Sequence, residues 1–246
     1  MPQLAIESAT KRYDSATALN AASLTLPDGV ITALIGPSGC GKSTLLKLCN
    51  GLIRPDSGEV RVFGEPIDYG ALPVLRRRLG YAVQGNVLFP HLTARDNITL
   101  LARLENWSES QIDERVTELM ELCQLLPKQL ERYPYQLSGG QQQRVGLCRA
   151  MMLRPEILLL DEPFAAIDPI TREDIQQQLL ALQQAEPRTC VLVTHDMREA
   201  LLLAEHIVVM GEGVILHSTS TADLRARNPS TDPQSLLHEL LAESGA

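Results

Sequence analysis

The stretch GPSGCGKST at residues 36–44, called the phosphate loop below, decides the fold of this chain. It fits the pattern G-x-x-x-x-G-K-[ST], in which glycines let backbone N–H groups converge on phosphate oxygens. The apolar run at residues 30–35 predicts a buried strand before the loop, and residues 45–48 predict the start of a helix after it. This order predicts a nucleoside triphosphate site on an α/β sheet. The alternative is a glycine-rich turn that matches by accident, and the flanking strand and helix disfavour it.

Two residues of the phosphate loop have side-chain roles in this chemistry. Lys42 is of the type that reaches the β- and γ-phosphates, and the hydroxyl of Ser43 is a ligand for Mg²⁺. The other residues contribute backbone groups and space. The predicted nucleotide-binding residues here are Gly36, Pro37, Ser38, Gly39, Cys40, Gly41, Lys42, Ser43 and Thr44.

A second group of polar residues follows the apolar run at residues 157–160. Asp161 and Glu162 come directly after this predicted strand, and open α/β sheets bind their ligands at the carboxyl ends of strands. Asp161 would hold Mg²⁺, and Glu162 would act as general base on the attacking water. A solvated strand end is the alternative, and the phosphate loop upstream argues against it.

The apolar runs along the chain predict the rest of the sheet. Residues 157–160, 190–193 and 207–210 are short and nearly continuous in apolar character, as expected of parallel strands covered on both faces. In residues 22–26 apolar and polar side chains alternate instead, which predicts a half-exposed strand before a turn at residues 27–29.

Two stretches are predicted to be helical. Between residues 93 and 152 no strand-like run occurs, and Ser108 with Gln111 forms a capping-box pattern before a run of helical spacing. After Thr221 two short helices are expected, at residues 222–227 and 233–242.

Composition excludes several classes of function. The chain has 246 residues and a net charge of −8, which disfavours broad electrostatic capture of nucleic acid. No apolar run approaches the roughly 18 residues of a membrane-spanning helix. Its five cysteines are an odd number and include no C-x-x-C pair, so neither a disulfide framework nor a zinc site is indicated. We therefore expect an intracellular globular protein that reaches a membrane only through partners.

The pentapeptide LSGGQ at residues 137–141, the signature segment, adds the most specific signal. With it, the sequence resembles the ATP-binding subunits of ABC transporters from about residue 13 to residue 218. The resemblance implies an α/β fold with a P-loop NTPase core of RecA-like type, an antiparallel β subdomain and an all-helical insertion. The ATPase domain would span residues 1–220, with core and β subdomain at 1–92 and 153–220 and the helical subdomain at about 93–152. Residues 221–246 would form a short helical tail.

The same resemblance implies a composite ATP site in a homodimer. The signature segment of one copy would bind the γ-phosphate of ATP held by the phosphate loop of the other, so that two copies clamp two nucleotides head to tail. The signature residues concerned are Ser138, Gly139, Gly140 and Gln141. Read without the resemblance, they form a glycine-rich helix cap.

Further roles attach to single residues through the resemblance. Tyr13 would stack on adenine, Gln84 would meet Mg²⁺, His195 would contact the γ-phosphate and Asp168 would cross the dimer interface. The respective alternatives are a packing tyrosine, an exposed loop amide, a structural histidine and a helix cap. The expected catalytic residues are thus Glu162, His195, Lys42 and Gln84, with Ser43, Gln84 and Asp161 as ligands of Mg²⁺.

Several runs are similar to the osmoprotectant branch of the family, which imports glycine betaine, choline and related quaternary amines. They lie at residues 75–81, 89–91, 132–134, 141–146 and 168–172. This similarity implies separate integral membrane permease subunits, an indirect link to a solute-binding protein, and a peripheral position on the cytoplasmic face of the inner membrane. The alternatives are an ATPase for another solute such as an amino acid or lipid, an exporter, or a soluble ABC ATPase acting on nucleic acid.

Overall fold

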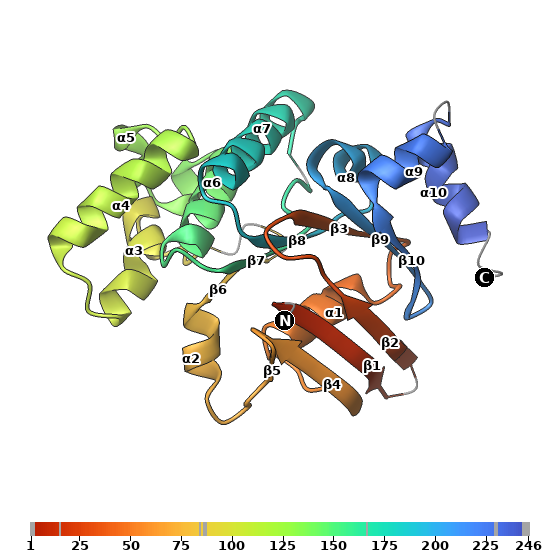
Figure 1. Cartoon of the computed structure of the whole chain (residues 1–246). Helices are drawn as coiled ribbons and strands as arrows, with labels where there is room; N and C mark the ends of the chain where they lie inside the picture. Colours follow the sequence, from red (N-terminus) through yellow and green to blue (C-terminus); the bar gives the residue numbers. More distant parts are fainter. Residues whose placement is uncertain are drawn as a thin grey trace. The chain divides into compact units, whose positions relative to one another are not determined.

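The computed structural model describes residues 3–14, 16–83, 85, 88–165, 167–228 and 231–242. The chain divides into two compact units, each with strands and helices of its own (Figure 1). The first unit combines residues 1–76 with residues 188–246, and the second comprises residues 77–187. The expected helical subdomain at 93–152 lies inside the second unit, and its boundaries remain a prediction.

The first unit contains the antiparallel sheet that the family resemblance implies, with strand order β2-β1-β4-β5. The edge strand β2 pairs with β1, and Leu24 lies opposite Ile6. Ala22 and Leu24 are 2% and 6% exposed, whereas their neighbours Ser23 and Thr25 are exposed. The half-exposed strand predicted at residues 22–26 is therefore confirmed. The strands are β1 (Leu4–Tyr13), β2 (Ala16–Thr25), β4 (Ser57–Val62) and β5 (Glu65–Pro66).

A second layer of the first unit has the strand order β10-β9-β3-β8. β3 (Ile31–Ile35) pairs in parallel with both β8 (Thr189–Val193) and β9 (His206–Gly211). Every residue of β3 and β8 is buried, which explains why their sequences are continuous apolar runs. The edge strand β10 (Val214–Ser220) is antiparallel to β9 and is half-buried along most of its length.

The first unit contains the helix predicted after the phosphate loop and the two predicted tail helices, and two further helices, α2 and α8. α1 (Lys42–Cys49) starts directly after the phosphate loop, and α8 (Met197–Leu203) follows β8. The two predicted tail helices are confirmed as α9 (Thr221–Arg227) and α10 (Pro233–Ala242). α10 packs on α8 and on β9 and β10, the blue part of the chain in Figure 1. The short helix α2 (Leu72–Arg77) ends one residue beyond residues 1–76, the first of the two segments of this unit.

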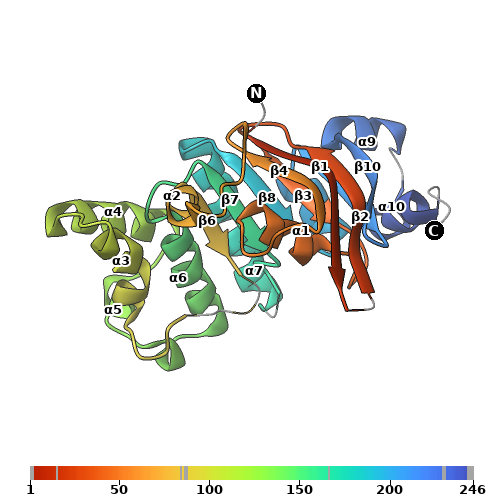
Figure 2. The same ribbon diagram turned by 90° about the horizontal axis from the view of Figure 1, so that it is seen from below.

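The second unit combines a pair of parallel strands with a cluster of helices (Figure 2). β6 (Leu79–Ala82) pairs in parallel with β7 (Ile157–Asp161). Residues 94–151 contain helices and loops and no strand, so the all-helical stretch is confirmed. Ser108 and Gln111 form the predicted capping box. The helices are α3 (Ala94–Leu104), α4 (Glu109–Leu122), α5 (Pro127–Leu130), the 3-10 helix η1 (Pro134–Gln136), α6 (Gly139–Met151) and α7 (Pro169–Ala185).

One buried arginine joins three helices of the second unit. Arg115 of α4 is 1% exposed and donates to Met151 O at 3.0 Å, at the end of α6. It also pairs with Glu186, just after α7, at 2.8 Å and with Glu118 at 2.8 Å. A buried guanidinium requires such partners, and removing one of them would leave an uncompensated charge. The cluster thus fixes α6 and α7, the helices that carry the signature segment and Asp168.

Within the described ranges, every helix is too short or too polar to cross a bilayer.

Candidate functional site

Glycines set the shape of the phosphate loop because the surrounding backbone leaves no room for side chains. A Cβ on Gly36 would lie 2.1 Å from Met210 O of β9, and a Cβ on Gly41 would lie 2.3 Å from Ala18 O of β2. Gly41 also has φ of 106°, which L residues rarely adopt. The loop is therefore pressed against strands that are distant in the sequence.

A backbone hydrogen bond ties the phosphate loop to the turn between β9 and β10. The N–H of Gly213 donates to Cys40 O at 3.1 Å, and Gly213 O accepts from Asn20 N at 2.9 Å. The turn thus bridges the loop and β2. These bonds hold the phosphate loop against the β9–β10 turn.

Lys42 lies inside the loop. Its side chain is buried, and Nζ donates to Gly36 O and Pro37 O, both at 2.8 Å, and lies 3.7 Å from Cys40 Sγ. These bonds hold the ammonium group against the carbonyls of the loop that the sequence predicts to bind phosphate. The predicted contact of Lys42 with the β- and γ-phosphates remains a prediction.

The N-terminus of α1 is suited to an anion. Gly41 is its N-cap, and within the described chain no side chain caps this helix. The first turn contains no acidic residue, so the positive end of the helix dipole is not offset locally. An anion at this position would receive N–H groups and a favourable field together.

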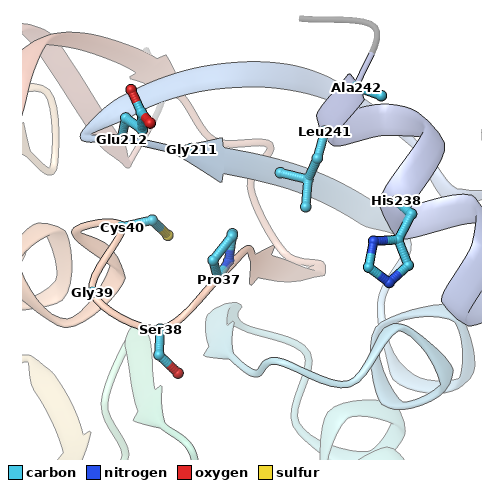
Figure 3. A pocket seen from close by; sticks show the side chains of 9 residues that line it. All are labelled: Pro37, Ser38, Gly39, Cys40, Gly211, Glu212, His238, Leu241 and Ala242. Carbon is cyan, nitrogen blue, oxygen red and sulfur yellow. The ribbon is translucent and has the colours of Figure 1, made fainter. Parts of the chain in front are cut away.

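A pocket of about 500 Å³ adjoins the phosphate loop (Figure 3). This volume lies in the range of ligand sites. One wall is the loop itself, and the other walls come from the β9–β10 turn and from α10. The lining residues are Pro37, Ser38, Gly39, Cys40, Gly211, Glu212, His238, Leu241 and Ala242.

His195 lies directly after β8 and is exposed. The neighbouring Thr194 is buried, donates from Oγ1 to Glu199 Oε2 at 2.5 Å and accepts from Asp196 N at 3.0 Å. These bonds fix the turn that presents the imidazole. His195 lines a second pocket, of about 430 Å³, whose opposite wall again comes from α10.

Tyr13 is the last residue of β1, and its ring is 43% exposed. Lys11 Nζ lies 5.7 Å from the ring centroid. An exposed ring of this kind fits stacking on a ligand better than packing in the core. Its contact with adenine remains a prediction.

Two carboxylates end β7 in the second unit. Asp161 is 5% exposed, and Glu162 is half-buried with φ of 46°. The left-handed backbone of Glu162 is uncommon outside glycine and is typical of functional sites. Burial and the negative charge of Asp161 raise the pKa of Tyr81, on β6, to about 12. Asp161 thus lies buried at the end of β7, and its role as a ligand of Mg²⁺ remains a prediction.

The signature segment begins α6 with a closed capping box. Gln141 N donates to Ser138 Oγ at 3.3 Å, and Ser138 N donates to Gln141 Oε1 at 3.1 Å. A Cβ on Gly139 would meet nothing within 4 Å, whereas a Cβ on Gly140 would lie 2.3 Å from Thr171 Cγ2 of α7. Gly140 is thus required for helix packing, while Gly139 faces open space.

Asp168 is the N-cap of α7, so the helix-cap interpretation of this residue is confirmed. Its Oδ1 accepts from Thr171 N at 3.0 Å. The backbone N–H and the hydroxyl of Thr171 hold the pKa of Asp168 below its usual range. Thr171 therefore contacts both Asp168 and Gly140, and brings the signature segment and the predicted interface aspartate together. The role of Asp168 at a dimer interface remains a prediction.

The donor chemistry of the predicted Mg²⁺ ligands fits that ion. Ser43 and Asp161 both offer hard oxygen atoms, the donor type Mg²⁺ prefers. Among the described residues no cluster of His, Cys, Asp and Glu could hold a metal by itself. In nucleotide sites Mg²⁺ usually takes its other ligands from phosphate oxygens and water. Gln84 lies outside the described residues.

Sequence reasoning missed one contributor to the site, helix α10. It lines the two pockets described above, yet no motif marks it. The only available signal was the spacing of Gln234, Leu237, His238 and Leu241, which places them on one helical face.

The fold and the two motif groups define an ATP-binding cassette. The family model described as "ABC transporter" matches residues 19–165. The chain belongs to this family of ABC transporter ATPases, and it is an ATP-binding enzyme of that class.

Individual relatives share most of the chain. It is 47% identical over 225 residues to the glycine betaine uptake system ATP-binding protein YehX of Escherichia coli, covering 91% of this chain and 72% of the relative. It is 44% identical over 230 residues to the glycine betaine/carnitine/choline transport ATP-binding protein OpuCA of Bacillus subtilis, covering 93% of this chain and 60% of that protein. The chain therefore spans between three fifths and three quarters of these relatives.

A solved structure agrees with the fold. The dimeric ATP-binding cassette MJ0796, in a post-hydrolysis state bound to ADP and Pi, superposes with a TM-score of 0.81 at 32% identity. The match covers 89% of this chain and 98% of that one. The α/β cassette fold predicted from the motifs is confirmed.

Proposed function

We propose that this chain is the ATP-hydrolysing subunit of an importer for glycine betaine, choline or a related quaternary amine. The observation that carries the solute class is the 47% identity over 225 residues to a glycine betaine uptake ATP-binding protein. The solute itself would be bound by other subunits. The cassette would supply the energy through ATP binding and hydrolysis.

The chemistry rests on positioning and charge stabilisation, because phosphoryl transfer needs little covalent help from a protein. Lys42 and the N–H groups at the start of α1 would bind the β- and γ-phosphates. Glu162 would orient and deprotonate the attacking water, and His195 would contact the γ-phosphate. Tyr13 would hold the adenine ring. Mg²⁺, held by Ser43, Asp161 and Gln84, would offset charge on the phosphates when bound.

The catalytic unit would be a head-to-tail homodimer. The dimeric state of the similar cassette MJ0796 supports this arrangement. Ser138, Gly139 and Gly140 of one copy would then approach the nucleotide held by the other, and Asp168 would cross between the copies. An isologous pair of this kind carries two equivalent sites.

In the cell the dimer would bind integral membrane permease subunits on the cytoplasmic face of the inner membrane. A solute-binding protein would act on the opposite side and contact the cassette only through the permease. The similarity of residues 75–81 and 89–91 to the osmoprotectant branch supports this assignment. We expect no nucleic-acid partner, since the chain is acidic overall.

Glu162→Gln tests the catalytic part of the proposal. The amide keeps the size of the side chain and removes the base, so we expect ATP binding to persist and hydrolysis to fall by at least about 100-fold. Size-exclusion chromatography with ATP should show a dimer that accumulates. Near wild-type turnover in this variant would remove Glu162 from the role of base.

Reconstitution tests the transport part. The permease subunits that co-purify with the chain, placed in vesicles supplied with ATP, should accumulate labelled glycine betaine or choline. Accumulation of a different solute, or export of one, would contradict the solute class while leaving the ATPase assignment intact. Stimulation of ATP hydrolysis by nucleic acid would instead indicate the soluble class of ABC ATPase.

A further inference from the structure

Helix α10 is fixed on the first unit by one face. Leu236 and Leu240 are 3% and 7% exposed, and they pack toward α8 and the β9–β10 pair. The Nε2 of His217, on β10, donates to Leu240 O at 2.9 Å and so satisfies a carbonyl in the last turn of the helix. These contacts give α10 a defined position and rotation.

The other face of α10 points at the two pockets. Gln234, Leu237, His238 and Leu241 follow the i, i+3, i+4, i+7 spacing of one helical stripe. Leu241 and His238 line the pocket of the phosphate loop, and Gln234, Leu237 and His238 line the pocket of His195. In Figure 3, Leu241 extends from α10 toward the side of the loop that carries Pro37.

His238 is the one lining residue that both pockets share. It is exposed, so its imidazole is accessible to a ligand. The opposite wall of the first pocket is the phosphate loop, and the second pocket contains His195. In the function proposed above, these two features surround the phosphate chain of ATP. An imidazole carries at least one N–H donor in either protonation state, which suits phosphate oxygens.

We propose that His238 is a further nucleotide-contacting residue, whose ring N–H donates to the phosphate chain of ATP bound at the phosphate loop. This assignment rests on the ATP-binding function proposed above. It makes α10 the third wall of the nucleotide site, beside the loop and the β9–β10 turn. His238 binds the nucleotide and takes no part in activating water, because Glu162 and His195 are assigned to the reacting end.

Nucleotide affinity tests the assignment. His238→Ala in the full chain should weaken ATP binding by about 10-fold to 150-fold in calorimetry, the range for losing one hydrogen bond to a charged group. In steady-state kinetics KM should rise by a similar factor while kcat changes less than twofold. His238→Gln, which retains an N–H donor, should recover part of the affinity. Glu239→Ala is the matched control, since Glu239 is exposed on the same turn and lines neither pocket.

A measurement on the unaltered chain covers the case in which the substitution loosens α10. The chain has five histidines, so the Cε1–H proton signal of His238 can be assigned by its loss in His238→Gln. It should shift when AMP-PNP, a non-hydrolysable ATP analogue, is added. An unmoved His238 signal, or equal affinities for ATP in His238→Ala and Glu239→Ala, would overturn the assignment.

Failure of the underlying function gives a different result. If the wild-type chain bound no ATP, or if Lys42→Ala bound it equally well, the nucleotide site itself would be misplaced. If wild-type binding depended on Lys42 and not on His238, only the role of α10 would be wrong.

Discussion

The N-termini of α1 and α6 both carry glycine, and they are built differently. α1 begins at Gly41, without a side-chain cap from the described residues. α6 begins at Ser138, whose hydroxyl and whose partner Gln141 close a complete capping box. The first end can accept a phosphate directly, whereas at the second a phosphate would compete with Ser138 Oγ for the N–H of Gln141.

This difference matches the two roles proposed for these ends. A helix end that binds ATP within one copy can rely on its own loop and on Lys42. A helix end that meets nucleotide only when a second copy docks would face solvent for part of the cycle, and its own cap would satisfy its donors during that time. The two helix ends therefore differ although both carry glycine. The N–H groups at the start of α1 are left for a ligand, whereas those at the start of α6 are capped by side chains of the same chain.

The largest loss of activity should follow from a substitution at the N-terminus of α1. Lys42→Ala removes the buried ammonium group of the phosphate loop, and ATP hydrolysis should fall by at least about 100-fold. Lys47→Ala, in the last turn of the same helix and exposed, should retain activity within about twofold. A phosphate-release assay on both variants measures the contrast, and comparable rates would contradict the role of Lys42.

The next effect separates the two glycines at the N-terminus of α6, Gly139 and Gly140. Gly140→Ala should destabilise the fold by about 1–3 kcal/mol in urea unfolding, because its Cβ would lie 2.3 Å from Thr171 Cγ2. Gly139→Ala should change stability by less than about 0.5 kcal/mol, since its Cβ meets open space. Thr171→Ser deletes the clashing methyl group, so combining it with Gly140→Ala should recover much of the lost stability. Equal losses for the two glycines would show that packing against α7 is not the cause.

A smaller effect tests whether the α6 cap has a second role. Ser138→Ala should cost about 1 kcal/mol of stability through loss of the cap. Ser108→Ala removes the equivalent capping box of α4 and should cost about the same. Only Ser138→Ala should also lower ATPase activity. If both variants kept full activity, Ser138 would be a helix cap and nothing more.

The smallest effect concerns pH and the cap of α7. The folded-state pKa of Asp168 is lowered by hydrogen bonds from Thr171, so its ionised form favours the folded state at neutral pH. That contribution is present above the unfolded pKa of about 3.9 and is lost as pH falls through the lowered folded value. The Tm difference between the wild type and Asp168→Asn should therefore be small at pH 7 and shrink further as the pH falls below about 3.9. A difference that grew on acidification would contradict this sign.

Local patterns were sufficient for the elements that carry the motifs. The buried strand β3, the glycine loop and α1 follow one another in sequence, so periodicity and glycine spacing predicted all three. The same holds for β7 with Asp161 and for the helices between residues 93 and 152. The antiparallel sheet was predicted only from the family resemblance. The reason is that β4 (Ser57–Val62) begins with polar residues and glycine and shows only weak alternation of apolar and polar residues.

Features built by long-range packing could not be predicted. The left-handed backbone of Glu162, the contact of Thr171 with Gly140 and the position of α10 beside the loop all depend on tertiary neighbours. His238 lies almost 200 residues after the phosphate loop. No local pattern places residues so far apart in the sequence around one pocket.

The hydrogen bond from Gly213 to Cys40, and the close approach of Gly36 to Met210, have a consequence for truncated forms of the chain. The stretch from residue 19 to residue 165 that matches the family model contains the phosphate loop, the signature segment and both carboxylates. It lacks the hairpin of β9 and β10, which contacts the phosphate loop through Met210 and Gly213. In a series of C-terminal deletions, nucleotide affinity should therefore disappear once the hairpin is cut, well before the last motif is reached.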